Sequence, residues 1–522
     1  MKQPVTMNGA EALCDTLLAG GVDTCFANPG TSEIHLVAAL DRRPRMRCVL
    51  GLFEGVVTGA ADGYGRMSEK PAATLLHLGP GLSNGLANLH NARRARTPVV
   101  NIVGDHASSH LPYDAPLTSD VEMLARPMSH WVRTVVHADD VSSATAAAIV
   151  EARSPPGQIA TLILRADAAW NQTSAPLQAV PKPRERPAAA DSRIRQAAQA
   201  IRAARAPLLM LSGVALRADA LAVAGRIAKA TGARLLAQQS NARIARGAGR
   251  VPIERVPYPT GEAIKVLEDV DKLILVGAKA PVGFFAYPGA PSVLTPPSCA
   301  ILELAAPGDD LLGVLQALAV ELRIGSKIAP DLATLARPAL PTGALTADAI
   351  AIAVAALMPE HAILCDESIT SGRRFFQTIS GAPPHDYLHL TGGAIGLGLP
   401  MAAGAAIACP DRKIIALQAD GSGMFTVQAL WTHARENLDI VTIIFSNRAY
   451  AVLRGEFRQV CANDPGENAR RLLDIDAPSI EWTSLAKGMG VDAISAATAE
   501  EFVKALRAAL ARRGPFLIEA LI

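Results

Sequence analysis

Short runs of β-branched and aliphatic residues alternate along the chain with stretches whose hydrophobic positions recur every three or four residues. Val99–Val103, Lys272–Val276 and Ile440–Phe445 are runs of the first kind, and Glu500–Leu510 is a stretch of the second. Continuous apolar runs are typical of parallel strands buried on both faces, and the three-to-four-residue spacing is typical of an amphipathic helix. This alternation predicts doubly wound α/β domains with parallel sheets.

Two linkers rich in proline and alanine divide the pattern, at about residues 171–191 and 328–346. Their prolines make regular secondary structure there unfavourable. The segments that they separate are 1–170, 190–325 and 345–522, and each has the size of one domain. We therefore predict an N-terminal domain, a central Rossmann-like domain and a C-terminal domain.

Composition and charge narrow the function classes. Of 522 residues, half are hydrophobic and 19% are charged, and the net charge is only +2, which argues against nucleic acid or an anionic membrane as the main partner. Residues 388–410 contain no Asp, Glu, Lys or Arg, but glycines and Pro400 interrupt them. We expect a buried glycine-rich loop that leads into a helix there, not a membrane span.

The cysteines are seven, scattered and without a CxxC pair, so neither a zinc site nor a disulfide framework is indicated. The first nine residues lack the apolar core of a signal peptide. Both observations predict a cytoplasmic protein.

A candidate phosphate and metal site follows two predicted strands near the C-terminus. The run Lys413–Gln418 leads to Asp420-Gly421-Ser422, and the run Ile440–Phe445 leads to Asn447. Carboxylate and amide oxygens suit Mg²⁺, which binds few protein ligands and completes its shell with phosphate oxygens and water. Gly421 permits close approach of a phosphate, and Ser422 can donate at a helix start. An ordinary Asp-Gly turn and an unrelated asparagine would explain the pair equally well.

Asp-Gly-Ser followed by Asn447 resembles the cofactor motif of thiamine-diphosphate-dependent enzymes, with Ala419 in place of a glycine and Ser446 in place of an asparagine. The resemblance implies that Asp420, Asn447 and the carbonyl of Ala449 would hold Mg²⁺. Gly421, Ser422 and Tyr450 would lie against the cofactor.

Two further segments share this resemblance. Thr391–Pro400 is similar to the segment beneath the cofactor, where the Gly393 carbonyl would accept from the cofactor's amino group and Ile395 would hold it bent. Asp366–Ser371 is similar to the loop that lines the diphosphate and thiazolium, with Glu367, Ser368 and Thr370 at the cofactor.

Glu54 is the predicted acid of the N-terminal segment. Such an enzyme needs a carboxyl group beside the aminopyrimidine to generate the ylid, and Glu54 lies among small and apolar residues at a predicted strand-to-helix junction. A carboxyl group there tends to be buried with a raised pKa, which suits a proton shuttle. Alone, it could equally be an acid stabilised by a helix dipole. The run from Glu54 to Arg66, however, resembles the family's glutamate signature.

The remaining N-terminal motifs indicate a branch of this superfamily. Phe26–Ser32 and His77–Gly85 resemble its substrate-side loops, and the latter is only a weak dinucleotide fingerprint because Asn84 replaces its last glycine. The chain is most similar to acetolactate synthase large subunits and benzoylformate decarboxylases. By that resemblance Thr31 would contact the substrate carboxylate and His77 would be catalytic.

One departure concerns the fate of the substrate. The second catalytic histidine of benzoylformate decarboxylases has no counterpart in Val282–Pro288, where Phe284, Phe285 and Tyr287 could pack the substrate pocket instead. Without that proton donor, the carbanion could be captured by a second carbonyl, which is carboligation. We therefore expect an enzyme that decarboxylates a small 2-oxo acid and passes the carbanion to a carbonyl acceptor or to a proton. The main alternative is a simple benzoylformate-type decarboxylase.

Other possibilities stay open from the sequence. His106 and His110 could line the same cleft, and Leu453 could lie beside the substrate. Three α/β domains would also suit an NAD(P)-linked oxidoreductase, although no predicted strand is followed by a complete GxGxxG motif. A non-catalytic homologue is a further alternative. FAD on the central domain is possible but not favoured, and the resemblance implies a homodimer or homotetramer with the cofactor between chains.

Overall fold

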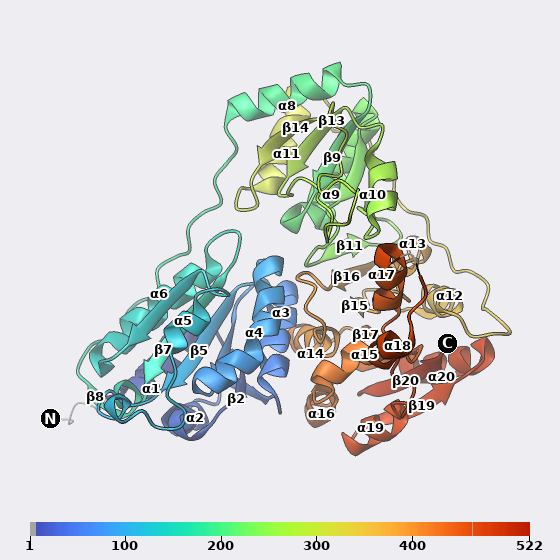
Figure 1. The fold of residues 1–522 in the computed structure, drawn as a ribbon. Coiled ribbons are helices and arrows are strands. Elements are labelled where there is room, and N and C mark those ends of the chain that lie inside the picture. The colour runs from blue at the N-terminus through green and yellow to red at the C-terminus, as the bar shows by residue number, and fades with distance from the viewer. Residues whose placement is uncertain (1–6, 462) are drawn as a thin grey trace.

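The protein is described here from a computed structural model, which covers residues 7–461 and 463–522. The chain forms three α/β units, each with its own sheet and helices (Figure 1). In chain order they are called below the N-terminal, central and C-terminal layers. The predicted α/β fold class is confirmed by the arrangement of parallel strands, with one exception at the edge of the third sheet.

The N-terminal sheet is entirely parallel, because a helix or a long connection joins each strand to the next. Its order is β3 (Arg47–Leu50), β2 (Thr24–Asn28), β4 (Ala72–Leu76), β5 (Val99–Asp105), β7 (Ile159–Arg165) and β6 (Trp131–Val135). The helices are α1 (Gly9–Ala19), α2 (Ile34–Asp41), α3 (Glu54–Ser68), α4 (Leu78–Ala95), α5 (Val121–Ala125), α6 (Val141–Arg153) and α7 (Ala166–Trp170). A two-stranded antiparallel ribbon joins β1 (Met7–Asn8) to β8 (Gln172–Thr173).

The central sheet is smaller and stands above the other two in Figure 1. Its order is β12 (Glu254–Arg255), β10 (Arg234–Ala237), β9 (Pro207–Leu211), β13 (Lys272–Val276) and β14 (Ala300–Ala305), again with parallel pairs. Its helices are α8 (Asp191–Ala203), α9 (Ala218–Thr231), α10 (Thr260–Leu267) and α11 (Leu311–Glu321).

The C-terminal sheet has seven strands. Their order is β11 (Ile244–Arg246), β16 (His385–His389), β15 (Ile363–Glu367), β17 (Ile414–Ala419), β18 (Ile440–Ser446), β20 (Phe516–Leu521) and β19 (Asp492–Ala496). The helices are α12 (Ala347–Leu357), α13 (Phe375–Thr378), α14 (Gly398–Ala408), α15 (Asp420–Gly423), α16 (Ala429–Arg435), α17 (Ala451–Cys461), α18 (Glu467–Leu473), α19 (Trp482–Gly488) and α20 (Ala499–Ala511).

The edge strand β11 corrects the expectation of purely parallel sheets. It comes from the central segment but pairs antiparallel with β16 of the C-terminal sheet, so that Ile244 lies opposite Tyr387. A strand of three residues carries no usable period, and for this reason the sequence pattern did not reveal it. The central segment is thus joined to the C-terminal sheet by backbone hydrogen bonds as well as by the chain.

Helices α3 and α14 bring the N-terminal and C-terminal layers together (Figure 1). Their backbones touch because glycines occupy the contact: a Cβ atom on Gly63 would overlap the Met401 carbonyl, and one on Gly404 would overlap the Ala60 carbonyl. Close packing of this kind tolerates no added methyl group. The two layers also share one hydrophobic cluster, which includes Phe26 and Met401.

A buried ion pair reinforces the same contact. The side chains of Arg66 and Asp62 are fully buried and 2.6 Å apart on α3. Arg66 also donates to the carbonyl of His389 at 2.7 Å and to the Thr391 hydroxyl at 2.9 Å, both in the C-terminal segment. A buried guanidinium needs such partners, so this motif residue has a structural task between the two layers.

The uncharged stretch 388–410 forms the end of β16, a loop and the buried helix α14, as predicted. In residues 7–461 and 463–522, no helix combines the length and the apolar character needed to cross a membrane. All seven cysteines are free. Residues 1–6, which belong to the N-terminal stretch considered above, lie outside the described residues.

Candidate active site

Most of the predicted cofactor residues gather around one cavity of about 720 Å³ between the central segment and the carboxyl ends of the C-terminal strands. In an open parallel sheet this edge is the usual place for a ligand. The cavity is lined by the predicted residues Glu367, Ser368, Thr370, Gly393, Ile395, Asp420, Gly421, Ser422, Asn447, Ala449, Tyr450 and Leu453. Phe284 and Phe285 of the central segment line it as well.

The predicted metal residues lie at the ends of adjacent strands, because β17 and β18 pair in parallel. One Asp420 oxygen accepts from the backbone N–H of Gly421 at 2.8 Å, and the other accepts from that of Arg448 at 2.6 Å. The Asn447 side-chain oxygen accepts from the Ala449 N–H at 3.1 Å. Burial raises the pKa of Asp420.

These residues fit a cation that is bridged to a phosphate. A carboxylate and an amide oxygen side by side provide two of the hard ligands that Mg²⁺ prefers and leave the others to phosphate and water. A Cβ atom on Gly421 would collide with the Tyr450 ring, so this turn can keep its shape only with glycine. The fit is to a magnesium–diphosphate group; no metal-binding cluster of three His, Cys, Asp or Glu side chains occurs in the described residues.

Glu367 is a second buried carboxylic acid beside the cavity and is only 1% exposed. Its oxygens accept from the backbone N–H groups of Gly396 at 2.6 Å and Gly398 at 2.5 Å. Burial raises its pKa to about 7, against the opposing effect of those hydrogen bonds. Glu367 therefore fixes the loop that contains Gly393 and Ile395.

Glu54 occupies the first position of α3, as predicted, and is 7% exposed. Asn28 at the end of β2 donates to one of its oxygens at 3.1 Å, and Asn84 on α4 donates to the other at 3.0 Å. Asn84, which replaces the last glycine of the dinucleotide motif, is therefore a hydrogen-bond partner of Glu54. Neither asparagine was predicted, since their link to Glu54 exists only in the folded chain.

His77 has a partner that the sequence analysis also missed. Its Nδ1 lies 2.6 Å from a carboxylate oxygen of Glu33, which is 1% exposed and also accepts from the Gly30 N–H at 2.8 Å. A carboxylate on Nδ1 fixes the ring and leaves Nε2 for another partner. Thr31 is exposed in the same turn, whereas Ser32 reaches the His77 ring at 3.3 Å.

The other candidates lie in two groups. His106 and His110 are close to each other, with ring centroids 5.3 Å apart, after β5. In the central segment, Tyr258 and Phe284 have centroids 5.3 Å apart and Phe284 and Phe285 5.1 Å apart. Of the three aromatic residues predicted at the pocket, Phe284 and Phe285 line the cavity and Tyr287 does not.

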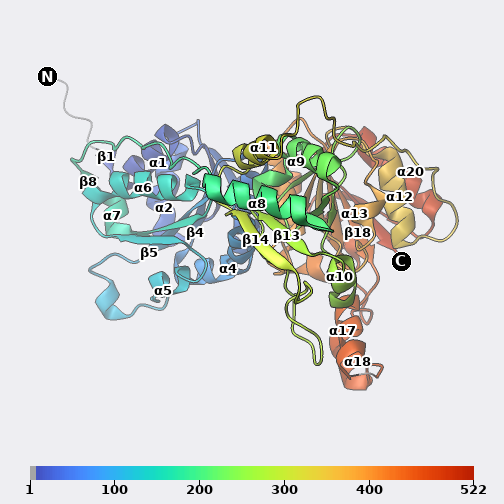
Figure 2. The same ribbon diagram turned by 90° about the horizontal axis from the view of Figure 1, so that it is seen from above.

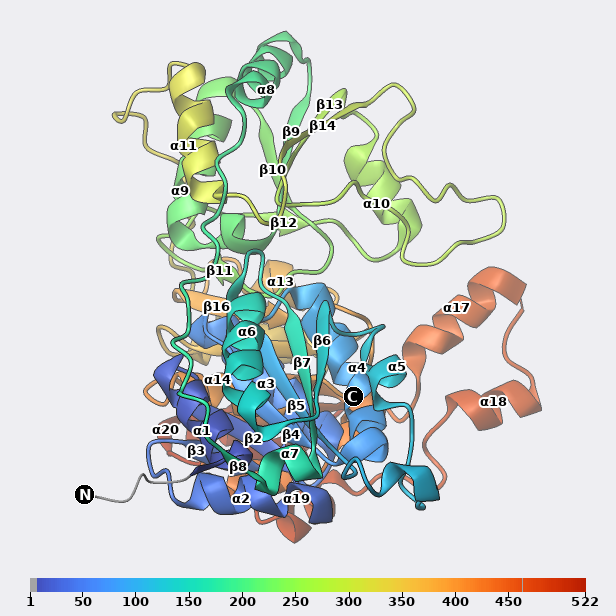
Figure 3. The same ribbon diagram turned by 90° about the vertical axis from the view of Figure 1, so that its left-hand side faces the viewer.

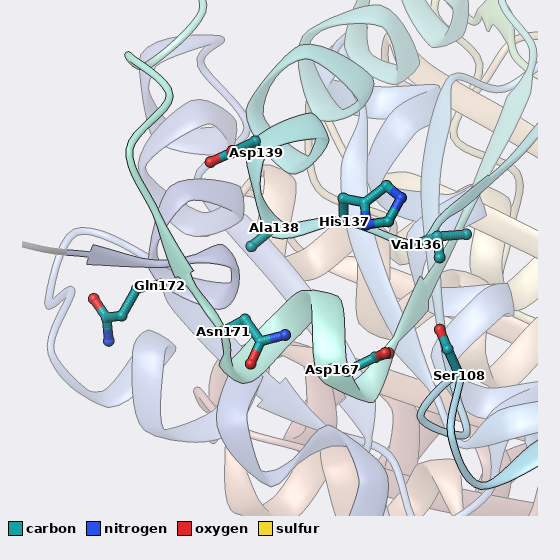
Figure 4. Close-up of a pocket in the computed structure, with 8 residues that line it drawn as sticks. All are labelled: Ser108, Val136, His137, Ala138, Asp139, Asp167, Asn171 and Gln172. Atoms are coloured by element: carbon teal, nitrogen blue, oxygen red, sulfur yellow. The ribbon is translucent and has the colours of Figure 1, made fainter.

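A second cavity of about 330 Å³ lies on the N-terminal layer at the ends of β6 and β7 (Figure 4). It is lined by Ser108, Val136, His137, Ala138, Asp139, Asp167, Asn171 and Gln172. None of the predicted site residues borders it. The chemistry therefore concentrates in the larger cavity and around Glu54.

Comparisons with known proteins agree with this geometry. Residues 7–130 match the family model of the thiamine pyrophosphate enzyme N-terminal TPP binding domain, and residues 371–520 match its C-terminal TPP binding domain. The chain is 51% identical to IlvX of Mycobacterium tuberculosis, provisionally named an acetolactate synthase large subunit, over 99% of both chains. It is 30% identical to a benzoylformate decarboxylase of Pseudomonas aeruginosa over 96% of both.

A solved structure is similar over the whole length. The thiamine diphosphate-dependent 4-hydroxybenzoylformate decarboxylase of Rhodococcus jostii superposes with a TM-score of 0.86 at 26% identity, with 99% of each chain covered. The likeness therefore extends over all three layers.

Proposed function

Because the chain belongs to the family of thiamine pyrophosphate enzymes, we propose that it uses thiamine diphosphate and Mg²⁺ to decarboxylate a small 2-oxo acid and to join the remaining acyl carbon to a carbonyl acceptor or to a proton. The observation that carries the proposal is the setting of Glu54. It is a buried carboxylic acid at a helix start, held on both oxygens by amide groups.

When bound, thiamine diphosphate supplies the nucleophilic carbon and the electron sink that this chemistry requires. Glu54 would hold the proton shared with the aminopyrimidine, and Asn28 and Asn84 would orient its two oxygens. Asp420, Asn447 and the Ala449 carbonyl would hold Mg²⁺ against the diphosphate. Because hydrogen bonds already fix these groups, little ordering is required when the cofactor binds.

On the substrate side, the Glu33–His77 pair would present His77 Nε2 to the reacting carboxylate or carbonyl. A histidine positioned in this way can accept a proton from the reacting group or donate one to it. Thr31 would contact the substrate carboxylate from the same turn. The roles of all these residues are proposals.

Glu54 is not among the residues that line the 720 Å³ cavity. This separation supports a homodimer or homotetramer in which Glu54 of one chain completes the cavity of another. A cytoplasmic location is proposed from the free cysteines.

The second candidate is a simple benzoylformate-type decarboxylase, and the His77–Glu33 pair favours it. One assay separates the two. Purified protein with Mg²⁺ and thiamine diphosphate is given pyruvate, branched or aromatic 2-oxo acids, with and without an aldehyde acceptor. Acyloin formation supports carboligation, free aldehyde alone supports the second candidate, and release of no CO₂ from any acid would refute both.

A further inference from the structure

The wall of the large cavity that faces the central segment is built from aromatic rings. Phe284 lies against Gly393, since a Cβ atom on that glycine would come within 2.8 Å of the tip of the Phe284 ring. Tyr258 packs on Phe284 with centroids 5.3 Å apart. From the loop expected beneath the cofactor, contacts therefore run outward through Phe284 to Tyr258.

A carboxylate stands at the outer end of this row. Glu456 lies on α17 and lines the cavity, and the Tyr258 hydroxyl donates to its Oε1 at 3.5 Å. Burial together with the Glu456 carboxylate raises the pKa of Tyr258, and the same two causes raise the pKa of Tyr287. Both phenols thus remain donors, and Glu456 is oriented as an acceptor.

The helix that carries Glu456 has no role in the core. None of the residues of α17 is buried, and α17 and α18 stand out from the rest of the molecule (Figures 2 and 3). Its inner face nevertheless borders the cavity through Leu453 and Glu456. Packing of the core therefore does not explain a carboxylate at this position.

Several other charged side chains line the cavity, namely Glu254, Arg255, Glu262, Arg373 and Arg374. Arg373 lies with its guanidinium carbon 5.9 Å from the Tyr258 ring centroid and is exposed, and Glu262 on α10 is exposed as well. Exposed charges are screened by water and move at low cost. Arg373 itself therefore provides a cation over the Tyr258 ring.

We propose that Tyr258, Phe284, Phe285 and Glu456 form the subsite for the substrate side chain, and that it selects 2-oxo acids whose apolar or aromatic side chain ends in a hydrogen-bond donor. The inference rests on the proposed function. Aromatic rings bind the apolar part, and a fixed carboxylate accepts from a hydroxyl or ammonium group at the end. The same carboxylate repels a side chain that ends in a carboxylate, so the subsite discriminates in both directions.

A matched set of phenylglyoxylates tests the subsite, with hydroxyl, aminomethyl, methyl or carboxylate in the para position. We expect the highest kcat/KM for the hydroxyl and aminomethyl acids and at least a roughly tenfold lower value for the carboxylate acid. Comparing the hydroxyl acid with the aminomethyl acid shows whether the subsite prefers a neutral hydrogen-bond donor or a cation. Glu456→Gln should lower the ratio of kcat/KM for the aminomethyl acid to kcat/KM for the methyl acid about tenfold, because the variant lacks the charge that accepts from the ammonium group. The ratio cancels any effect of the substitution on the chemical step that both acids share. Glu262→Gln, a carboxylate on the same cavity without a tyrosine partner, should change that ratio less than about twofold.

Binding gives a second measurement that needs no turnover. The corresponding mandelates, which carry a hydroxyl in place of the ketone, are titrated by calorimetry into wild type and Glu456→Gln. The same order of affinities supports the subsite even if no 2-oxo acid reacts, in which case only the proposed function fails. Preference for the methyl or carboxylate compound, or an unchanged order in Glu456→Gln, would overturn the subsite while leaving the proposed function intact.

Discussion

The buried carboxylates of the candidate site accept hydrogen bonds from two different kinds of donor. Glu54 in the N-terminal layer is held by the side-chain amides of Asn28 and Asn84, which come from other elements of that layer. Glu367 and Asp420 in the C-terminal layer are held by backbone N–H groups of glycine-rich turns and of Arg448. The partners lie at similar distances along the chain in both cases, 26 and 30 residues from Glu54 and mostly 28 to 31 residues from Glu367 and Asp420, so the difference is between side-chain and backbone donors.

This difference predicts how each site responds to substitution. Side-chain donors can be removed one at a time, so the Glu54 site should degrade in steps. Backbone donors persist after most substitutions, so in the C-terminal layer the site should respond mainly to replacement of the carboxylate itself.

Glu54→Gln should lower kcat by about 10²- to 10⁴-fold, the range for loss of a positioned proton-transfer group. Thermal stability should fall only slightly, because the amide retains the shape and one acceptor oxygen, but its NH2 group faces the side-chain amide of either Asn28 or Asn84, which must turn its own oxygen towards that group. The measurement is CO₂ release with the best 2-oxo acid at saturating cofactor. A variant within threefold of wild type would contradict the proposed proton role.

Glu367 should make the apoprotein less stable as pH rises. Its pKa is raised by folding from 4.5 to about 7, so the native state binds the extra proton in that window. Its stabilising contribution is complete below pH 4.5 and is lost as pH rises towards 7, by ~3 kcal/mol in total. Urea unfolding of wild type and Glu367→Gln at several pH values isolates this contribution.

The comparison with Glu367→Gln is necessary because buried histidines change the free energy of unfolding with pH in the opposite direction. Burial lowers the pKa of His433 to about 4, so its contribution to stability increases with pH between that value and 6.5. Both proteins contain His433, and its effect cancels in the difference. A difference between wild type and Glu367→Gln that does not vary from pH 4.5 to 7 would show that Glu367 titrates normally.

Asp420→Asn should weaken binding of thiamine diphosphate in the presence of Mg²⁺ by at least about tenfold, since the variant lacks the charge that faces the metal. The asparagine side chain has one acceptor oxygen for the two backbone N–H groups of Gly421 and Arg448, so the variant also loses one hydrogen bond at this turn. Calorimetric titration measures the loss. Asp411→Asn, at an exposed turn before β17, is the control and should bind as wild type.

Asn84→Ala should have the smallest effect, because Asn28 continues to hold the other oxygen of Glu54. Loss of one hydrogen bond to a charged group is worth about 1.5–3 kcal/mol at most, and partial replacement by water at this exposed position should limit the fall in kcat to about tenfold. Ser83→Ala on the same helix is the control. If Asn84→Ala were as inactive as Glu54→Gln, the two donors would not act separately.

Part of the candidate site could be predicted from the sequence. Asp420 and Asn447 were predicted to follow strands that can be neighbours, and β17 and β18 do pair, because apolar runs mark the strands and polar turns follow them. Gly393 and Glu367 were named as cofactor residues from the resemblance of their segments to the family, and those roles stay predictions. The pattern thus marks Asp420 and Asn447 each at the end of its own strand, although the two lie 27 positions apart.

Side-chain partners were missed. Asn28 and Asn84 lie inside the motifs Phe26–Ser32 and His77–Gly85, and Glu33 follows the first of them, but only the folded sheet brings these side chains to Glu54 and His77. Strand β11 crosses to the C-terminal sheet for a similar reason. Contacts of this kind leave no periodic signal in a single sequence.

The backbone contact between α3 and α14 has a consequence for the ancestry of such chains. Gly63 and Gly404 leave no side chain that could adjust to a changed partner helix. A chimera that took its first layer from one relative and its last from another would succeed only if both parents had small residues at these positions. The N-terminal and C-terminal layers would therefore be inherited as a pair.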